Sequence, residues 1–402
     1  MHRLIIILLL ISIISCEAEK IDDNPTDVPL ALCIDGHAKF TSNGVSYEFE
    51  CDGYDLMSYI SLNEMDADSG NDCWGWTDSQ SGKEYALMGL DNGTAIVDIS
   101  IPTAPKYLGK IPTSTQSSSW RDLKVYNEHV FIVSEASDHG MQVFDLRRLR
   151  GISNKQIFNP DYVYQGYGQA HNIAINTETA YAYTAGSGLD INGRPGFGLH
   201  ALNISNPLSP LLEMQFPEYG YTHDAQIIIY KGPDSEHIGK EIYIGSNENK
   251  VVFVDVTDKS NPNLISEFFY DDEYTHQSWL TEDHRYALLG DELDELDTTT
   301  RPWKLKSEAK TRTIVVDITD LDNPILHFNY FGNTKSIDHN GYIVGNNYFL
   351  ASYTSGLRVI NIKNIDDKNF SEVGFFDTHT ETHNHNLVRK TSIRNFDPGD
   401  HT

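Results

Sequence analysis

Four histidines recur along the chain in the same local setting, each followed by a polar residue and then by an apolar run. They occur in the pairs His171-Asn172, His223-Asp224, His276-Gln277 and His339-Asn340, and His223 and His276 each end a Tyr-Thr-His tripeptide. Neutral imidazoles that converge on one point can ligate Zn²⁺ or another divalent ion. They can also act as acid and base groups or bind a polar ligand.

A repeated unit of β-strands positions these histidines. Its clearest sign is an alternating apolar run that ends in Asp or Asn, which occurs six times, at Asp98, Asp145, Asn203, Asp255, Asp317 and Asn361. Successive positions are 47, 58, 52, 62 and 44 residues apart, the length of a four-stranded propeller blade with variable loops. Such alternation is typical of half-buried strands, and the final Asp or Asn can bond the following backbone in an Asx-turn.

Within each unit the run that begins near a histidine comes first, followed by a middle strand, the strand ending in Asp or Asn, and a connecting strand. We therefore predict that the first strands surround a central channel and that their first residues lie at one mouth of it. The first two units carry Trp74 and the pair Arg121-Asp122 at this position. The alternative to a metal or ligand site is a structural ring, in which each His and its polar neighbour hydrogen-bond adjacent blades.

The sequence accordingly predicts an all-β fold, a β-propeller with a seven-bladed plan whose last blade is incomplete or divergent. We expect the propeller over residues 33–378, with 33–60 as an N-terminal lead-in. Residues 379–402 are polar, His-rich and without strand alternation, which predicts an irregular tail. An unclosed propeller would leave a strand edge exposed to pairing with another chain.

The N-terminal residues predict export. A short basic start precedes an apolar run from Leu4 to Ile14, which is too short to span a bilayer and has the length of a signal-peptide core. We predict a lipoprotein-type signal peptide over residues 1–15 with Cys16 as the lipidated residue; a plain secretory signal is the alternative. Residues 16–32 are acidic and polar, as expected of a flexible tether. In an exported protein, Cys33 and Cys51 are expected to form a disulfide.

The charge of the chain narrows its partners. The sequence has 58 acidic and 30 basic residues, for a net charge of −28 at pH 7. Nucleic acids and anionic membrane surfaces attract clusters of Lys and Arg, so this balance argues against both as partners. Attachment to the outer membrane is expected through the lipid anchor instead.

A second candidate for metal binding is the acidic run at residues 291–297. Asp291, Glu292, Asp294 and Glu295 could bind Ca²⁺ through carboxylate oxygens. The run lacks the glycine-punctuated spacing of known calcium loops, which favours a solvated surface loop. Familiar catalytic signatures, such as a G-x-S-x-G elbow, an H-E-x-x-H helix or a phosphate-binding glycine loop, do not occur in the sequence.

Several long strings resemble the choice-of-anchor B family, whose members carry LVIVD-type repeats. Among them are "WGWTDSQSGKEYALMGLDNGTAIVDIS" (74–100), "YTHQSWLTEDHRYALLGDELDE" (274–295) and "IDHNGYIVGNNYFLASYTSGLRVINI" (337–362). The resemblance runs from Cys33 to about Asp377 and implies a secreted or surface-attached, propeller-like protein. It carries no catalytic residues over to this chain. Family members usually continue past the string "VGFFDT" with a further strand pair, whereas residues 379–402 do not follow that pattern.

These observations favour a surface-attached or secreted binding module for an extracellular protein or glycan, with enzymatic activity the less favoured possibility. The alternative is a metal-dependent hydrolase or lyase that uses the histidines at the channel mouth. The candidate cofactor is a divalent metal ion, Zn²⁺ or Ca²⁺, and the candidate ligands are His171, His223, His276, His339, Asp291 and Glu292.

Overall fold

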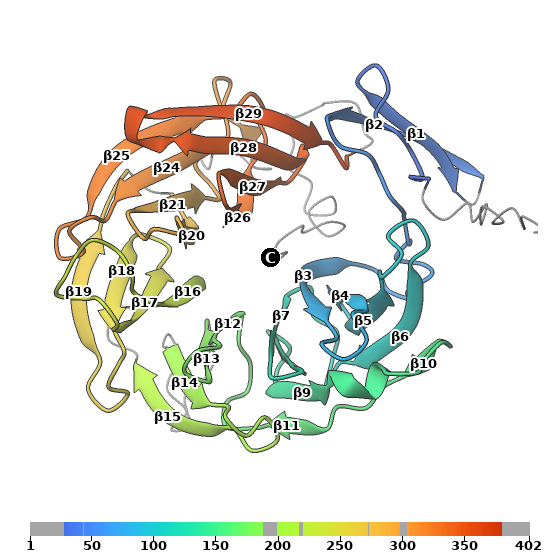
Figure 1. The fold of residues 1–402 in the computed structure, drawn as a ribbon, viewed down its shortest axis with the longest axis horizontal. Helices are drawn as coiled ribbons and strands as arrows, with labels where there is room; N and C mark the ends of the chain where they lie inside the picture. The colour runs from blue at the N-terminus through green and yellow to red at the C-terminus, as the bar shows by residue number, and fades with distance from the viewer. Residues whose placement is uncertain are drawn as a thin grey trace, which may run out of the picture.

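The computed structural model describes residues 28–42, 44–187, 199–216, 220–271, 273–297 and 304–379. In this part of the chain six sheets are arranged around a central axis, as the six blades of an all-β propeller (Figure 1). The predicted signal peptide, Cys16, most of the tether and the tail beyond His379 lie outside the described residues. No helix in the described part of the chain is long and apolar enough to cross a membrane.

Each blade has four strands that follow one another from the axis outward, each antiparallel to its neighbour. Blade 1 contains β3 (Gly70–Thr77), β4 (Glu84–Leu90), β5 (Gly93–Asp98) and β6 (Lys106–Pro112). Blade 2 contains β7 (Arg121–Tyr126), β8 (His129–Ser134), β9 (Met141–Asp145) and β11 (Tyr162–Tyr164), and β10 (Gln156–Ile157) pairs in parallel with β6 of blade 1. Blade 3 contains β12 (Asn172–Asn176), β13 (Tyr181–Ala185), β14 (Leu199–Asn203) and β15 (Leu211–Phe216).

The remaining blades follow the same plan. Blade 4 contains β16 (Asp224–Ile229), β17 (Glu241–Ser246), β18 (Val251–Asp255) and β19 (Asn263–Phe268). Blade 5 contains β20 (Thr275–Leu280), β21 (Tyr286–Asp291), β24 (Arg312–Asp317) and β25 (Ile325–Phe331), with the short hairpin β22 (Leu296–Asp297) and β23 (Lys304–Leu305) inserted. Blade 6 contains β26 (Asp338–Val344), β27 (Asn347–Ser352), β28 (Gly356–Asn364) and β29 (Asn369–Phe376).

The predicted Asx-turns are present in all six blades. The side-chain oxygen of Asp98, Asp145, Asn203, Asp255, Asp317 or Asn361 accepts a hydrogen bond from the backbone N–H two residues later, at 2.9–3.2 Å. In five blades this residue ends the third strand, and in blade 6 Asn361 lies within β28. The recurring Asp or Asn is therefore a structural residue that turns the chain toward the fourth strand.

Apolar cores lie between consecutive blades. Five clusters of buried side chains join blades 1 and 2, 2 and 3, 3 and 4, 4 and 5, and 5 and 6. The inner strands β3, β7, β12, β16, β20 and β26 also pack on one another in that order. Among the described residues, blades 6 and 1 share no such cluster, and β26 does not pack along β3 as the other neighbouring inner strands do. The described ring is therefore open at one seam.

Backbone-to-side-chain hydrogen bonds tie neighbouring inner strands together. The acceptors are side-chain oxygens of Asn71, Asp122, Gln226 and Gln277. Their donors are, in the same order, the backbone N–H groups of Arg121, Ile173, Leu280 and Gly341, at 2.6–3.0 Å. Each bond joins the inner strand of one blade to that of the next. Because these strands lie in the interior, their polar groups need such partners, as the structural alternative of the sequence analysis expected.

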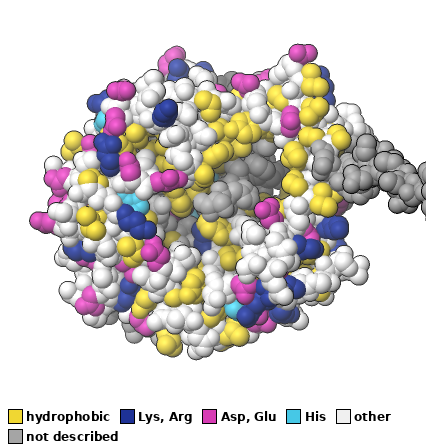
Figure 2. Space-filling view, viewed as in Figure 1, with side chains coloured by type: hydrophobic (Ala, Val, Ile, Leu, Met, Phe, Trp, Pro, Cys, Tyr) yellow, Lys and Arg dark blue, Asp and Glu magenta, His cyan; other side chains and the backbone are white. Residues whose placement is uncertain are grey.

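The N-terminal residues add a hairpin to the last blade. Strands β1 (His37–Ser42) and β2 (Val45–Asp52) pair with each other, and Cys51 and Asp52 of β2 pair with Phe376 and Phe375 of β29. The predicted disulfide between Cys33 and Cys51 is confirmed. The sixth blade has all four of its strands, and the seven-bladed plan that the sequence led us to expect is not seen in the described part of the chain. Acidic and basic side chains are interspersed around the ring on the face shown in Figure 2.

Candidate functional site

The four histidines form a continuous arc around the axis. His171 and His223 directly precede β12 and β16, while His276 and His339 are the second residues of β20 and β26. The ring centroids of His171 and His223 are 4.2 Å apart, those of His223 and His276 4.3 Å, and those of His276 and His339 4.0 Å. The repeat therefore brings imidazoles from four consecutive blades into contact.

A small cavity of about 110 Å³ lies beside this arc. All four histidines line it, together with Asp122, Asn172, Asp224, Asn340 and Glu292 from the sequence prediction and with Asn71, Asp72, Trp120, Ala351, Ser352 and Tyr353, which that prediction did not include. The cavity is thus polar and surrounded by residues of blades 1 to 6. Its size suits an ion with its water or a small polar group, since pockets for drug-sized ligands are several times larger, about 300 Å³ or more.

His223 and His276 are buried and uncharged. Nδ1 of His223 lies 3.2 Å from the carbonyl oxygen of His276, and because a carbonyl can only accept, Nδ1 carries the proton. The lone pair of His223 is therefore on Nε2. Burial, together with the neighbouring histidines, lowers the pKa of His223 and of His276 well below the usual range. Both imidazoles are neutral at pH 7, the state that a metal ion requires.

Two glutamates approach the arc from the ends of second strands. Glu292 follows β21, its Oε2 lies 3.9 Å from Nε2 of His276, and its other oxygen accepts a hydrogen bond from the hydroxyl of Tyr353. Glu135 follows β8 and lies 2.7 Å from Nδ1 of His171. The sequence prediction missed Glu135 and Tyr353. An alignment of the residues that follow the second strands would have found them, because antiparallel strands bring that position to the mouth where the first strand begins.

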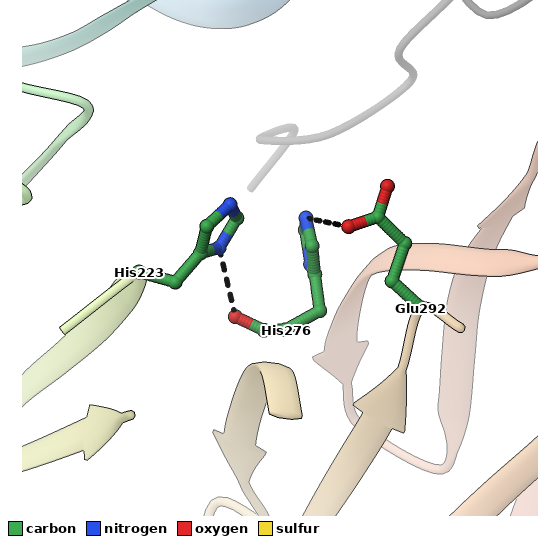
Figure 3. Close-up of side chains that lie close together, drawn as sticks. All are labelled: His223, His276 and Glu292. Carbon is green, nitrogen blue, oxygen red and sulfur yellow. Dashed lines mark hydrogen bonds and ion pairs between the residues drawn. The ribbon is translucent and has the colours of Figure 1, made fainter. Parts of the chain in front are cut away.

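Three of these side chains could hold one metal ion. Ligand atoms of His223, His276 and Glu292 all lie within 4.8 Å of one another (Figure 3). Around a tetrahedral ion with bonds of about 2.0–2.1 Å, two ligand atoms are about 3.3 Å apart, so the ligand atoms would have to approach one another by up to about 1.5 Å to complete the geometry. Two imidazoles and a carboxylate are a donor set typical of zinc and other first-row divalent ions with open positions.

Asp224 lies beneath the arc in a charged but buried environment. Burial raises the pKa of Asp224 to about 7, an effect that the nearby ammonium of Lys124 reduces. That ammonium is 2.9 Å from Asp122 and lies 4.7 Å from the ring centre of Trp74. The floor of the cavity is therefore a network of carboxylates around one lysine.

Four predicted site residues point elsewhere. Trp74 packs against the apolar core between blades 1 and 2. The fully buried Arg121 donates from Nε to the carbonyl of Leu90, 2.9 Å away, and its Nη1 lies 2.9 Å from Nε2 of His139.

The other two residues belong to blade 5. Gln277 accepts from the Gly341 N–H and donates to the Tyr342 hydroxyl. Asp291 accepts from the N–H groups of Glu273 and Tyr274, at 2.9 and 2.7 Å. None of these four lines the cavity, and each makes structural contacts.

Gly186 takes the position after the second strand of blade 3, where other blades carry Glu135, Glu292 or Tyr353. Its φ is +58°, and a Cβ atom there would lie 2.5 Å from the Cβ of His171 and 2.9 Å from the hydroxyl of Tyr221. A side chain at this position would push His171 out of the arc. A glycine is therefore required for the arc to extend onto blade 3.

Comparison with known proteins identifies the repeat. Residues 81–113 and 238–269 match the LVIVD repeat, and each match spans the second to fourth strands of a blade. The chain therefore contains LVIVD repeats. No curated protein matches the chain.

Several solved structures are similar to the chain. A putative 6-phosphogluconolactonase from Bacteroides uniformis is 12% identical, with a TM-score of 0.55 over 82% of this chain and 94% of that one. A protein from Lactobacillus plantarum is 14% identical, with a TM-score of 0.47 over 76% and 82%. The β-propeller domain of Myceliophteria thermophila Cps50 (Swd1) is 9% identical, with a TM-score of 0.47 over 74% and 84%. At 12% identity the likeness to the Bacteroides uniformis protein concerns the fold alone.

The neutral state of His223 predicts a pH-dependent contribution to stability. In the folded protein the pKa of His223 is below the usual range, whereas in the unfolded chain it is about 6.5. Below that pH the unfolded chain therefore binds one more proton at this residue than the folded chain does. We expect the stability advantage of the wild type over His223→Gln to shrink by about 1.4 kcal/mol per pH unit below about pH 6.5. Urea unfolding with a chelator present, between pH 7.5 and 5, measures it. An advantage that is constant over this range would contradict a buried, neutral His223.

Proposed function

We propose that this protein is an exported, surface-attached β-propeller whose axial site binds a divalent transition-metal ion and, at that ion, a small ligand. The observation that carries the proposal is the convergence of ligand atoms of His223, His276 and Glu292 within 4.8 Å beside a polar cavity. Contacts outside the trio support the arrangement. The His276 carbonyl orients His223, and Tyr353 orients Glu292, as outer partners commonly do for metal ligands.

The mouth of the cavity favours a sugar as the ligand. Trp120 lines the cavity and is 51% exposed, so its indole offers an apolar surface next to polar groups. Such an aromatic side chain can cover the apolar face of a sugar ring, while the amide oxygens of Asn172 and Asn340 have no hydrogen-bond partner and can accept from the hydroxyls. Of the two partner classes that the sequence favoured, these contacts support the terminal residue of an extracellular glycan more than a protein surface.

The metal site can be tested with Zn²⁺ itself. We expect the full-length mature protein, treated with EDTA and purified without a histidine tag, to bind Zn²⁺ in isothermal titration calorimetry. The variants His223→Ala and Glu292→Gln should each lose one bound ion per chain, because each removes one of the three ligands. The matched control is His327→Ala, since His327 lies on the outer strand β25 and its Nε2 bonds the carbonyl oxygen of Ile365, at 2.8 Å.

Equal Zn²⁺ binding by the wild type, His223→Ala and Glu292→Gln would contradict the site. Circular dichroism spectra of all variants would establish that the fold is retained. The alternative from the sequence analysis, a purely structural ring, predicts no ion and a lower melting temperature for both ligand variants.

A second candidate function is metal-assisted hydrolysis. It is favoured by the 2.7 Å contact between Glu135 and His171, because an imidazole oriented by a carboxylate can take up a proton from an attacking water. An ion held by three protein ligands would supply that water at its open position. His171 contacts His223, so the proton acceptor and the candidate ion position are adjacent.

The hydrolytic candidate predicts turnover of simple chromogenic esters and lactones by the Zn²⁺-loaded protein. Glu135→Gln should lower kcat by about 100-fold or more and leave the affinity for Zn²⁺ unchanged, because Glu135 acts on His171 and not on the ion. If the loaded wild type and the metal-free protein hydrolyse these substrates equally slowly, the site binds its ligand without hydrolysing it.

Export and anchoring belong to the same proposal, as does membership of the choice-of-anchor B family. The basic start, short apolar run and Cys16 support a lipoprotein signal, and the disulfide between Cys33 and Cys51 is of a kind that persists in oxidising compartments. The LVIVD repeats agree with the family resemblance.

For the anchor we expect Cys16→Ala to move the protein from the membrane fraction to the soluble exported fraction. The reason is that the thiol of Cys16 is the acylation site in the proposed signal. Cell fractionation followed by immunoblotting measures the shift, and a high-salt wash of wild-type membranes is the control for peripheral binding. Membrane attachment that survives the substitution would refute lipidation at Cys16.

A further inference from the structure

The turn that follows β21 is buried or partly buried throughout, in contrast to the solvated loop that its acidic sequence favoured. Asp291 is 0% exposed and Glu295 is 1% exposed. Asp338, the first residue of β26 in the next blade, is also 0% exposed. Carboxylate oxygens of Asp294, Glu295 and Asp338 all lie within 4.8 Å of one another. The interface between blades 5 and 6 therefore encloses a cluster of three carboxylates.

Several oxygens of this cluster have no hydrogen-bond partner outside it. Both side-chain oxygens of Asp338 bond no other residue, and Oδ1 of Asp294 and Oε2 of Glu295 have no partner beyond the contact between these two carboxyl groups. A buried carboxylate without partners is strongly unfavourable, and like charges at close range repel each other further. Four such atoms at one place indicate that a cation belongs there.

The cationic side chains nearby compensate only part of the charge. The guanidinium of Arg312 donates to Asp294 through Nε and also lies 3.7 Å from Asp291, which is already held by two backbone N–H groups. The backbone N–H of Arg312 donates to Oε1 of Glu295, at 3.2 Å. Lys306 bonds the backbone carbonyl of Asp294, at 2.8 Å, and not its carboxylate. Arg312 thus offsets one of the three charges of the cluster.

We propose that Asp294, Glu295 and Asp338 bind a calcium ion between blades 5 and 6. All the candidate donor atoms are oxygens, which Ca²⁺ and Mg²⁺ prefer over the nitrogen-preferring ions of the histidine arc. Each Ca–O bond is about 2.3–2.6 Å, so ligands on opposite sides of the ion are about 5 Å apart, which agrees with the spread of these oxygens. Mg²⁺ would require a tighter and more regular octahedron.

Glycine at position 290 makes room for Asp338. A Cβ atom there would lie 2.6 Å from Oδ2 of Asp338, so any side chain at this point of β21 would displace the carboxylate. Ser352, directly opposite Asp338 in the ladder between β26 and β27, has a buried hydroxyl oxygen without a hydrogen-bond partner. It offers a further oxygen near the ion. The site is therefore formed by the turn after β21 of blade 5 and by strands β26 and β27 of blade 6.

The calcium site does not depend on the proposed function, since its three carboxylates are not ligands of the axial site and its donor chemistry is different. The two sites are nevertheless connected by the chain, because Glu292 lies on the turn between Asp291 and Asp294. An ion bound by Asp294 and Glu295 would fix this turn to blade 6. It would thereby hold Glu292 in position beside His276.

Calcium itself is the probe for this site. We expect the melting temperature of the EDTA-treated full-length protein to rise by several degrees on addition of CaCl₂ at millimolar concentration, the range in which extracellular calcium modules bind. In Asp338→Asn and Glu295→Gln the rise should be lost or require at least about tenfold more calcium, because each removes a charged ligand. Glu308→Gln, an exposed acid of the same region, is the matched control.

The order of stabilities gives a second readout. Without calcium, Asp338→Asn should be at least as stable as the wild type, since it removes one repelling charge; with calcium the wild type should become the more stable. A wild type without any calcium response, or a response that Asp338→Asn and Glu295→Gln retain in full, would overturn the proposal. The first result would mean that the carboxylates carry protons instead. His223→Ala should keep the calcium response, which separates this test from that of the zinc site.

Discussion

The architecture depends on how polar inner strands are satisfied in the interior of a ring. Side-chain oxygens of Asn71, Asp122, Gln226 and Gln277 each accept a hydrogen bond from the inner strand of the next blade. These bonds fix the stagger between consecutive inner strands, because each joins one side chain to one particular backbone N–H. With that stagger fixed, the residue at the start of each strand comes to the same height on the axis. The contacts of His276 with His223 and with His339 follow from this alignment, while His171 and His223 meet where β12 packs along β16.

The two proposed sites differ in their ligand atoms, although both use residues of the turn after β21. Nitrogen donors of His223 and His276 lie on the axis, and the oxygens of Asp294, Glu295 and Asp338 lie between two blades. First-row transition ions favour imidazole, whereas calcium binds oxygen almost exclusively. The same stretch of chain can therefore serve both sites without competition for one ion. Glu292 belongs to the axial site because Tyr353 turns its carboxylate toward His276.

Much of the fold could be predicted from the sequence because the repeat carries its own local signals. The Asx-turns at Asp98 through Asn361 depend only on a residue and the backbone two positions later, and all six are present. The same periodicity indicated that the histidines belong to equivalent positions. What failed depends on distant contacts. The pairing of β2 with β29 joins residues more than 300 positions apart, and nothing local to either strand announces it.

Equivalent positions of the repeat also carry side chains with different contacts and different chemistry. Arg121 occupies the place of a histidine, but its long side chain reaches the carbonyl of Leu90 and leaves the cavity. The sequence prediction missed Glu135 because it considered only the starts of the first strands, and Glu135 follows the end of a second strand. The burial of the acidic run could not be inferred from its composition, since exposed and metal-binding carboxylates have the same sequence. Only the position of Asp338 on the neighbouring blade distinguishes them.

The hairpin of β1 and β2 has a mechanical consequence. The disulfide between Cys33 and Cys51 joins its two ends covalently. Tension applied to the chain before Cys33 would pass through the sulfur atoms to Cys51 and would leave the hairpin unloaded. From there it would divide between the pairing with Phe375 and Phe376 on the outer strand of blade 6 and the segment that leads to blade 1. A pull on the chain before Cys33 would thus load the two blades that flank the seam and would spare blades 3, 4 and 5.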